Sequence, residues 1–109
     1  MKDKKFLIDM IPAIDAIEIY RVPTFDQFIR DEKTQDAIMF NLVILGEAAN
    51  QISSDFRDLN PEVPWAAIIG TRNIIVHGYD QIKLNIVWDI LTKELARLRK
   101  LLVVLDSNL

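Results

Sequence analysis

Residues 84–105 read LNIVWDILTKELARLRKLLVVL, and this stretch decides the fold that the sequence predicts. Its apolar positions are separated by alternating steps of four and three: Leu84, Trp88, Leu91, Leu95, Leu98, Leu102 and Leu105. An α-helix brings such positions onto one face, and the spacing is typical of helices that pack in a bundle with a coiled-coil-like seam. We therefore predict one long helix whose seam faces other helices.

A second long apolar pattern lies between residues 35 and 56. Its main stripe consists of Ile38, Leu42, Leu45, Ala49, Ile52 and Phe56. Because Phe40, Val43 and Ile44 fall on other sides of the same helix, a second buried surface is implied. Glu47 lies almost opposite the main stripe. It is either a solvated surface charge or, if the second face is a subunit interface, a hydrogen-bond acceptor for Arg72 or its partner.

The N-terminal third of the chain predicts two further helices. The first carries an apolar stripe of Phe6, Met10, Ala13, Ile14 and Ile17. Pro12 lies inside that pattern, so we expect a kink or a late start. Thr24 and Gln27 fit a capping box that opens a short helix ending near Arg30, and Thr34 is the predicted N-cap of the next helix.

Residues 60–64, Asn-Pro-Glu-Val-Pro, predict a loop because two closely spaced prolines cannot continue a helix. Pro64 suits the first turn of a short helix that carries Trp65, and Gly70 with Thr71 is expected to interrupt it. No stretch alternates as a strand would. The prediction is one domain, residues 1–109, folded as an all-α bundle of four to five helices.

The amino-acid composition limits the classes of protein to which the chain can belong. Of 109 residues, 50% are hydrophobic and 27% charged, which suits a single buried core. The absence of cysteine excludes disulfides and thiolate metal sites and is compatible with a reducing compartment, so we expect a cytoplasmic protein. The apolar run after the basic N-terminus is interrupted by acidic residues, and no window resembles a membrane helix.

The charge balance argues against a general nucleic-acid coat. The formal net charge is −3, so any contact with RNA or DNA is expected to be local. A basic stripe lies on the flank of the C-terminal helix and consists of Lys93, Arg97 and Lys100. It is either solvated surface or a contact for a phosphate backbone.

The candidate site is the stretch Arg72-Asn73-Ile74-Ile75-Val76-His77-Gly78-Tyr79, which holds the only histidine of the chain. On a helix Arg72 and His77 are about 140° apart, whereas Asn73 and His77 share a face. Arg72 and Tyr79 also share a face if the helix continues, although Gly78 is a natural end for it. The stretch therefore offers two neighbouring polar edges, each of which can meet its own copy across a two-fold axis.

An imidazole beside a guanidinium suits metal-independent RNA cleavage. His77 can act as general base or acid, and Arg72 can stabilise the charge that builds on the phosphate. Because the reaction needs both an acid and a base, a chain with one histidine can supply both by dimerising. From the residues alone, a capping histidine and a surface arginine remain the alternative. No metal site or cofactor is expected, and Ser53 and Ser54 lie in no hydrolase motif.

The same residues resemble a known family. Arg72-Asn73-x-x-x-His77-x-Tyr79 is similar to the Arg-x-x-x-x-His-x-Tyr signature of the HepT-like toxins of the HEPN superfamily. Further matches are Gly46-Glu47-Ala48-Ala49, Pro64-Trp65, Gly70, Gly78 and Val87-Trp88. Thr71 departs from the pattern, since relatives often carry a larger apolar residue there. The resemblance implies a small all-α homodimer in which two motifs face each other and cleave RNA without a metal.

The resemblance also implies roles for individual residues. Arg72 and His77 would be catalytic, with Asn73 as the polar residue that positions them. Glu47 is a further supporting residue on the ground of its place on the long helix, not of the resemblance. Tyr79 matches the tyrosine that a minimal nucleotidyltransferase antitoxin modifies with AMP, which would silence the nuclease. The competing hypothesis is a non-catalytic helical scaffold that binds and regulates such a nucleotidyltransferase.

Overall fold

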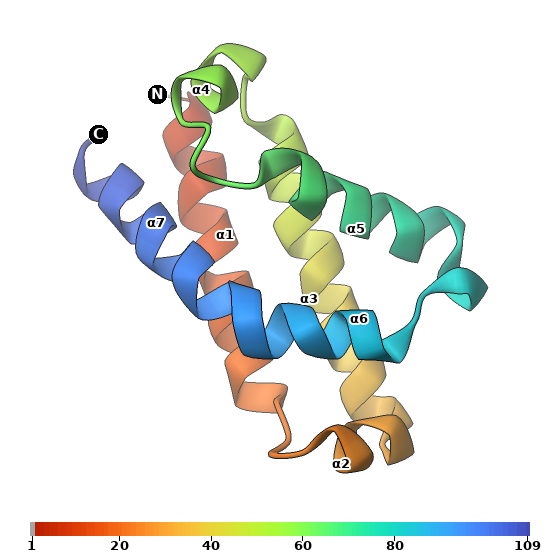
Figure 1. The fold of residues 1–109 in the computed structure, drawn as a ribbon. Coiled ribbons are helices and arrows are strands. Elements are labelled where there is room, and N and C mark those ends of the chain that lie inside the picture. The colour runs from red at the N-terminus through yellow and green to blue at the C-terminus, as the bar shows by residue number, and fades with distance from the viewer. Residues whose placement is uncertain (1) are drawn as a thin grey trace.

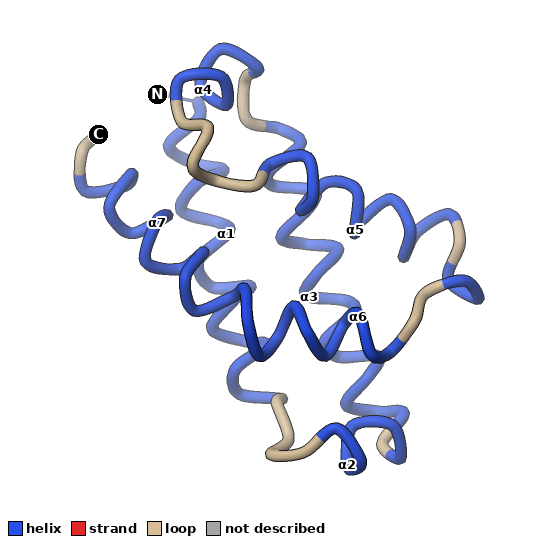
Figure 2. Tube along the Cα trace, viewed as in Figure 1, coloured by secondary structure: helices blue, strands red, loops and turns tan. Residues whose placement is uncertain are grey.

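The computed structural model describes residues 2–109, and all secondary structure within them is helical (Figure 1; Figure 2). The elements are α1 (Lys2–Tyr20), α2 (Phe25–Arg30), α3 (Glu32–Gln51), α4 (Ser54–Leu59), α5 (Trp65–His77), a 3₁₀ turn (Tyr79–Gln81), α6 (Leu84–Asp89), a π-helical stretch (Ile90–Glu94) and α7 (Leu95–Ser107). The predicted all-α class is confirmed. If the run from Leu84 to Ser107 is counted once, residues 2–109 form six helices, one more than the largest number predicted.

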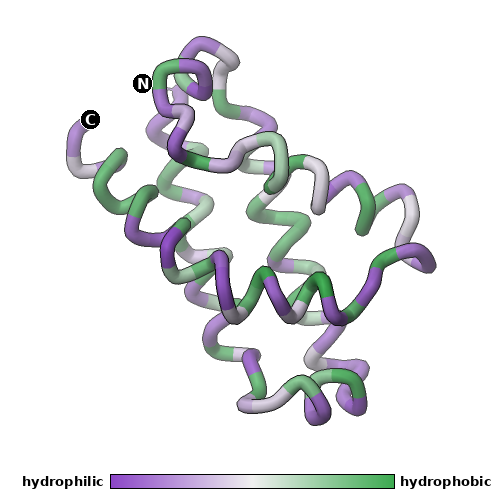
Figure 3. The backbone as a smooth tube through the Cα atoms, in the orientation of Figure 1, coloured by the Kyte–Doolittle hydropathy of each residue, from purple (hydrophilic) through white to green (hydrophobic). Residues whose placement is uncertain are grey.

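The bundle is built on the antiparallel pair α1 and α3. Helix α5 packs on α3, and α7 packs on α1, so that α5 and the C-terminal run lie on neighbouring parts of the pair (Figure 1). Hydrophobic and hydrophilic residues alternate along these helices, as the green and purple segments of Figure 3 show. The largest fully buried side chains come from several helices: Leu7, Met10, Ile14, Ile17, Phe28, Ile38, Ile52, Leu91, Leu95 and Leu102.

The predicted long helix of residues 35–56 is in fact two helices. Helix α3 ends at Gln51, and Ser53 caps a separate α4 by accepting a hydrogen bond from the Phe56 amide. Asp3 of α1 accepts hydrogen bonds from both the Ser53 amide and the Ser53 hydroxyl, each at 2.8 Å. This contact between distant parts of the chain fixes the break, which explains why the apolar periodicity did not reveal it.

The structure also decides two points about helix starts. Helix α1 begins at Lys2 and continues through Pro12, so of the two alternatives expected from Pro12, a kink or a late start, the late start does not occur. The N-cap of α3 is Asp31, not Thr34, because the Asp31 carboxylate accepts hydrogen bonds from the Thr34 amide at 3.1 Å and the Thr34 hydroxyl at 2.8 Å. A carboxylate outcompetes the hydroxyl as acceptor for the free amides of a first turn. Thr24 does cap α2, as predicted.

Helix α5 is longer than predicted. It runs without interruption through Gly70 and Thr71 to His77. The Thr71 hydroxyl donates to the Ala67 carbonyl one turn earlier, so the hydroxyl has a hydrogen-bond acceptor inside the helix. A glycine within a helix costs only about 1 kcal/mol, which the packing of α5 on α3 offsets. The longer helix places Arg72, Asn73 and His77 on one rigid element.

The C-terminal seam is largely as predicted, with one shift. Leu91, Leu95 and Leu98 are buried, but the seam begins at fully buried Val87, with Trp88 only partly buried. The π-helical stretch Ile90–Glu94 accounts for this shift, because its wider turn keeps successive steps of four residues on one face.

Candidate functional site

The site begins where α3 and α5 cross. Gly46 of α3 faces Arg72 of α5, and a β-carbon built on Gly46 would overlap the Arg72 Cβ and stand 3.1 Å from the Ile68 carbonyl oxygen. Only a glycine leaves room for two helices at this separation. The close crossing therefore holds the base of the Arg72 side chain against α3, one residue before Glu47.

Arg72 is fixed through all three guanidinium nitrogens. Its Nε and Nη2 donate to Glu47 Oε1 at 3.1 and 2.6 Å, and its Nη1 donates to Asn73 Oδ1 at 2.8 Å. The Arg72 side chain is 21% exposed and that of Glu47 is 47% exposed, so the pair lies at the surface of the α3–α5 crossing. Of the two alternatives for Glu47, the hydrogen-bond acceptor for Arg72 is therefore the one present, and the contact lies within one chain.

His77 lies in the last turn of α5 and is exposed. Asn73, one helical turn earlier, is also exposed and shares its face, as the sequence predicted. Gly78 ends the helix: its amide donates to the Ile74 carbonyl at 2.8 Å. The chain thus presents an imidazole at a helix terminus, about 140° around the axis from Arg72.

Tyr79 leaves α5 altogether, because it opens the 3₁₀ turn after Gly78. Its hydroxyl donates to Asp36 Oδ1 of α3 at 2.8 Å, and the residue as a whole remains 53% exposed. The hydrogen bond to Asp36 raises the pKa of Tyr79, with smaller contributions from burial and from the charges of Asp36 and Glu32. Asp36 was not among the site residues predicted from the sequence. The only available signal was its helical spacing, one turn before Phe40 on the face that ends at Glu47.

Exposed apolar side chains border these polar groups. Phe40 is 65% exposed and Ile44 is 36% exposed, and both follow Asp36 along the same face of α3. Val76 of α5, one turn after Arg72, is 46% exposed. We call Phe40, Ile44 and Val76 the apolar patch. Phe40 and Ile44 belong to the second apolar face that the sequence predicted on the long helix, whereas Val43 of that predicted face is partly buried against the core.

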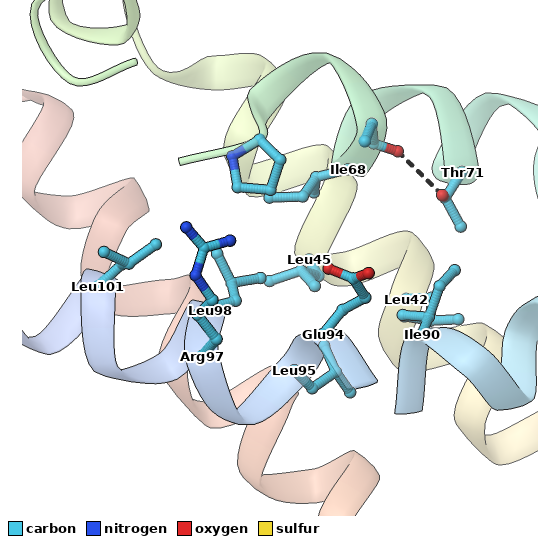
Figure 4. A pocket seen from close by; sticks show the side chains of 12 residues that line it. Leu42, Leu45, Ile68, Thr71, Ile90, Glu94, Leu95, Arg97, Leu98 and Leu101 are labelled. Carbon is cyan, nitrogen blue, oxygen red and sulfur yellow. Dashed lines mark hydrogen bonds between the residues drawn. The ribbon is translucent and has the colours of Figure 1, made fainter. Parts of the chain in front are cut away.

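Two hollows lie in the neighbourhood of the site. One, of about 420 Å³, is formed by one face of α1 and one face of α3, and we call it the α1–α3 hollow. Its wall consists of Phe6, Asp9, Pro12, Ile44, Glu47, Ala48 and Gln51. The other, of about 240 Å³, lies between α5 and the C-terminal run and is lined mostly by apolar residues, with Glu94 and Arg97 at its edge (Figure 4). Neither Arg72 nor His77 lines this second hollow, whereas Glu47 belongs to the first.

Metal ligands do not gather at the site. Within residues 2–109, no group of three or more histidine, aspartate or glutamate side chains is arranged to hold a metal ion. In the same part of the chain, none of the helices combines the length and the apolar character that crossing a membrane requires.

Comparison with known proteins places the chain among ribonucleases. The family profile described as "Ribonuclease HepT-like" matches residues 10–105. A protein named "Probable ribonuclease HepT" from Thermococcus cleftensis is 34% identical over 97 residues, which span 88% of each chain. A "Putative RNase" from Methanocaldococcus jannaschii is 35% identical over 98 residues, covering 89% of this chain and 90% of the relative. No solved structure matches.

The resemblance noted in the sequence is thereby confirmed, because the profile spans both the α3–α5 crossing and the stretch from Arg72 to Tyr79. With its helical bundle and these ribonuclease relatives, the chain belongs to the HepT-like ribonuclease family.

Proposed function

We propose that this protein is a metal-independent endoribonuclease toxin of a toxin–antitoxin pair, with Arg72 and His77 as its catalytic residues. The observation that carries the proposal is the fixed guanidinium of Arg72 on the same helix as an exposed His77. Glu47 and Asn73 position the guanidinium before any substrate binds, so little reorganisation is needed as charge develops on a phosphate.

The proposed reaction is transesterification of the RNA backbone. One His77 takes the proton of a ribose 2′-hydroxyl while that oxygen attacks the adjacent phosphorus. The bond from phosphorus to the 5′-oxygen breaks, and a second His77, which starts in the protonated imidazolium form, donates its proton to the leaving oxygen. Arg72 stabilises the negative charge on the non-bridging oxygens. The products are a 2′,3′-cyclic phosphate and a 5′-hydroxyl, and no other reactant is consumed.

A homodimer supplies the second imidazole. Each chain has one histidine, and the apolar patch of Phe40, Ile44 and Val76 lies beside the site. Burying this patch between two copies would remove exposed apolar surface from water and bring two α5 helices together. The composite site at that interface then contains two guanidinium groups and two imidazoles.

A minimal nucleotidyltransferase antitoxin would silence the enzyme by attaching AMP to Tyr79. Support comes from the half exposure of Tyr79 and its position two residues after His77. The attached nucleotide would occupy the space beside the imidazole, and its phosphate would compete with RNA for Arg72.

The test is cleavage of total cellular RNA by the purified protein in EDTA. Wild type should cleave, whereas Arg72→Ala and His77→Ala should lose at least about 100-fold in rate with unchanged helical content and dimer mass. Arg30→Ala is the matched control, because Arg30 pairs only with Asp26 on the exposed surface of α2. Intact mass must first show that Tyr79 is unmodified. If well-folded, unmodified wild type leaves RNA intact, the protein is a scaffold rather than a nuclease.

A further inference from the structure

The α1–α3 hollow lies beside the proposed site and shares one residue with it. Glu47 forms part of the wall of the hollow and also holds Arg72. Both hydrogen bonds from Arg72 fall on Glu47 Oε1, so Oε2 remains an acceptor for another donor. A group bound in the hollow and a phosphate bound to Arg72 would therefore lie on two sides of the same carboxylate.

The walls of the hollow combine apolar surfaces with hydrogen-bonding groups. Phe6, Pro12 and Ile44 supply apolar surface, and Asp9 and Gln51 supply a carboxylate and an amide. Lys5 occupies only Oδ2 of Asp9, at 3.1 Å, which leaves Oδ1 as an acceptor. A planar, unsaturated group with hydrogen-bonding edges suits such a surface, because its faces stack on apolar side chains while its edge meets the polar ones.

The charged side chains of the hollow favour some planar groups over others as ligands. Its two carboxylates, Asp9 and Glu47, accept hydrogen bonds, and within residues 2–109 the cations that pair with them are Lys5 and Arg72. A phosphate would be repelled there, whereas a nucleobase rich in N–H donors would be favoured. Guanine presents adjacent N1–H and N2–H donors that one carboxylate can accept together, and its O6 can accept from the Gln51 amide. Uracil presents one N–H between two carbonyl oxygens and fits poorly.

We propose that the α1–α3 hollow binds a guanine base of single-stranded RNA, next to the phosphate that Arg72 holds. This inference rests on the proposed ribonuclease function and adds a base preference to it. Asp9 and Gln51 then determine specificity, and the enzyme cuts beside guanosine rather than at any phosphate.

The experiment compares synthetic single-stranded RNAs that differ at one position. A uridine-rich strand receives a single guanosine, inosine, adenosine or uridine, and the cut position and kcat/KM are measured for each. Guanosine should direct the cut to a neighbouring phosphate. Inosine, which lacks only the 2-amino group, should lower kcat/KM about tenfold, as expected when one of two paired hydrogen bonds is lost.

Variants of the hollow separate the base contact from catalysis. Asp9→Ala and Gln51→Ala should reduce the preference for guanosine over uridine, measured as the ratio of kcat/KM for the two strands. Asp58→Ala is the matched control, since Asp58 is an exposed aspartate of α4 that does not line the hollow. Its base preference should equal that of wild type.

Binding of mononucleotides makes the inference testable without cleavage. Guanosine 3′-monophosphate should bind more tightly than the inosine and uridine 3′-monophosphates, and Asp9→Ala should remove that difference. Cleavage without any base preference, a preference that survives both hollow variants, or equal binding of the three nucleotides would overturn the proposal. Loss of all RNA cleavage with guanosine-selective binding intact would instead count against the ribonuclease function alone.

Discussion

Gly46 of α3 lies so close to Arg72 of α5 that a β-carbon at position 46 would approach the Arg72 Cγ to 2.9 Å. We expect Gly46→Ala to destabilise the protein by about 1–3 kcal/mol, because the two helices must separate or Arg72 must leave its rotamer. RNA cleavage should fall as well, since the guanidinium loses its alignment with Glu47. Thermal unfolding and cleavage rates measure the two effects.

Gly70 is the matched control. It lies inside α5, and a β-carbon built there meets nothing within 4 Å. Gly70→Ala should therefore stabilise the protein by about 0.5–1 kcal/mol and leave cleavage unchanged. If the two alanine variants behave alike, the close crossing of α3 and α5 does not position Arg72.

Glu47 should support catalysis through Arg72. Glu47→Ala frees two nitrogens of the guanidinium, so kcat should fall about 10- to 100-fold while helical content stays the same, because the Glu47 side chain is half exposed. Glu47→Gln retains an acceptor oxygen and should keep an intermediate rate. A Glu47→Ala protein that cleaves faster than wild type would show that the carboxylate restrains Arg72 instead.

The hydrogen bond between Tyr79 and Asp36 should be visible in a pH titration. In a Tyr20→Phe background Tyr79 is the only tyrosine, and its phenolate absorbance should rise at higher pH than that of a free tyrosine. Asp36→Asn should bring the pKa of Tyr79 back toward its ordinary value, because the charged acceptor is gone. An unchanged titration would mean that this hydrogen bond does not form in solution.

The same contact affects stability in a defined direction. Because folding raises the pKa of Tyr79, the contact stabilises the fold below the ordinary tyrosine pKa and is lost as pH rises through the folded value. Asp36→Asn should therefore unfold more easily than the parent at neutral pH. The difference should disappear in strongly alkaline solution, as chemical denaturation at several pH values would show.

The apolar patch should control assembly. Phe40→Asp places a charge in the proposed interface, so the protein should become monomeric and lose RNA cleavage. Val104→Asp is the control, since Val104 is a similarly exposed apolar residue on α7, outside the patch. Light scattering after size exclusion measures the mass. A dimeric and active Phe40→Asp protein would place the interface elsewhere.

Local sequence patterns predicted the helical class, the α2 cap at Thr24 and most of the C-terminal seam. They failed where distant residues decide the outcome. The end of α3 depends on Asp3, which lies 50 residues from its partner Ser53, and the continuity of α5 depends on its packing against α3. The spacing of apolar residues predicts which side of a helix is buried. It does not predict how strongly that helix packs against another one.

The sequence by itself determined which groups could carry chemistry: one histidine, an arginine five positions earlier and the pattern that links both to the HepT-like ribonucleases. The tertiary structure alone decided their surroundings. Asp36 meets Tyr79, Glu47 fixes Arg72, and Glu47 also joins the hollow between α1 and α3. Asp36 and Tyr79 are 43 residues apart in the chain, and Glu47 and Arg72 are 25 apart, so only the close packing of α3 against α5 and the turn that follows α5 brings each pair together.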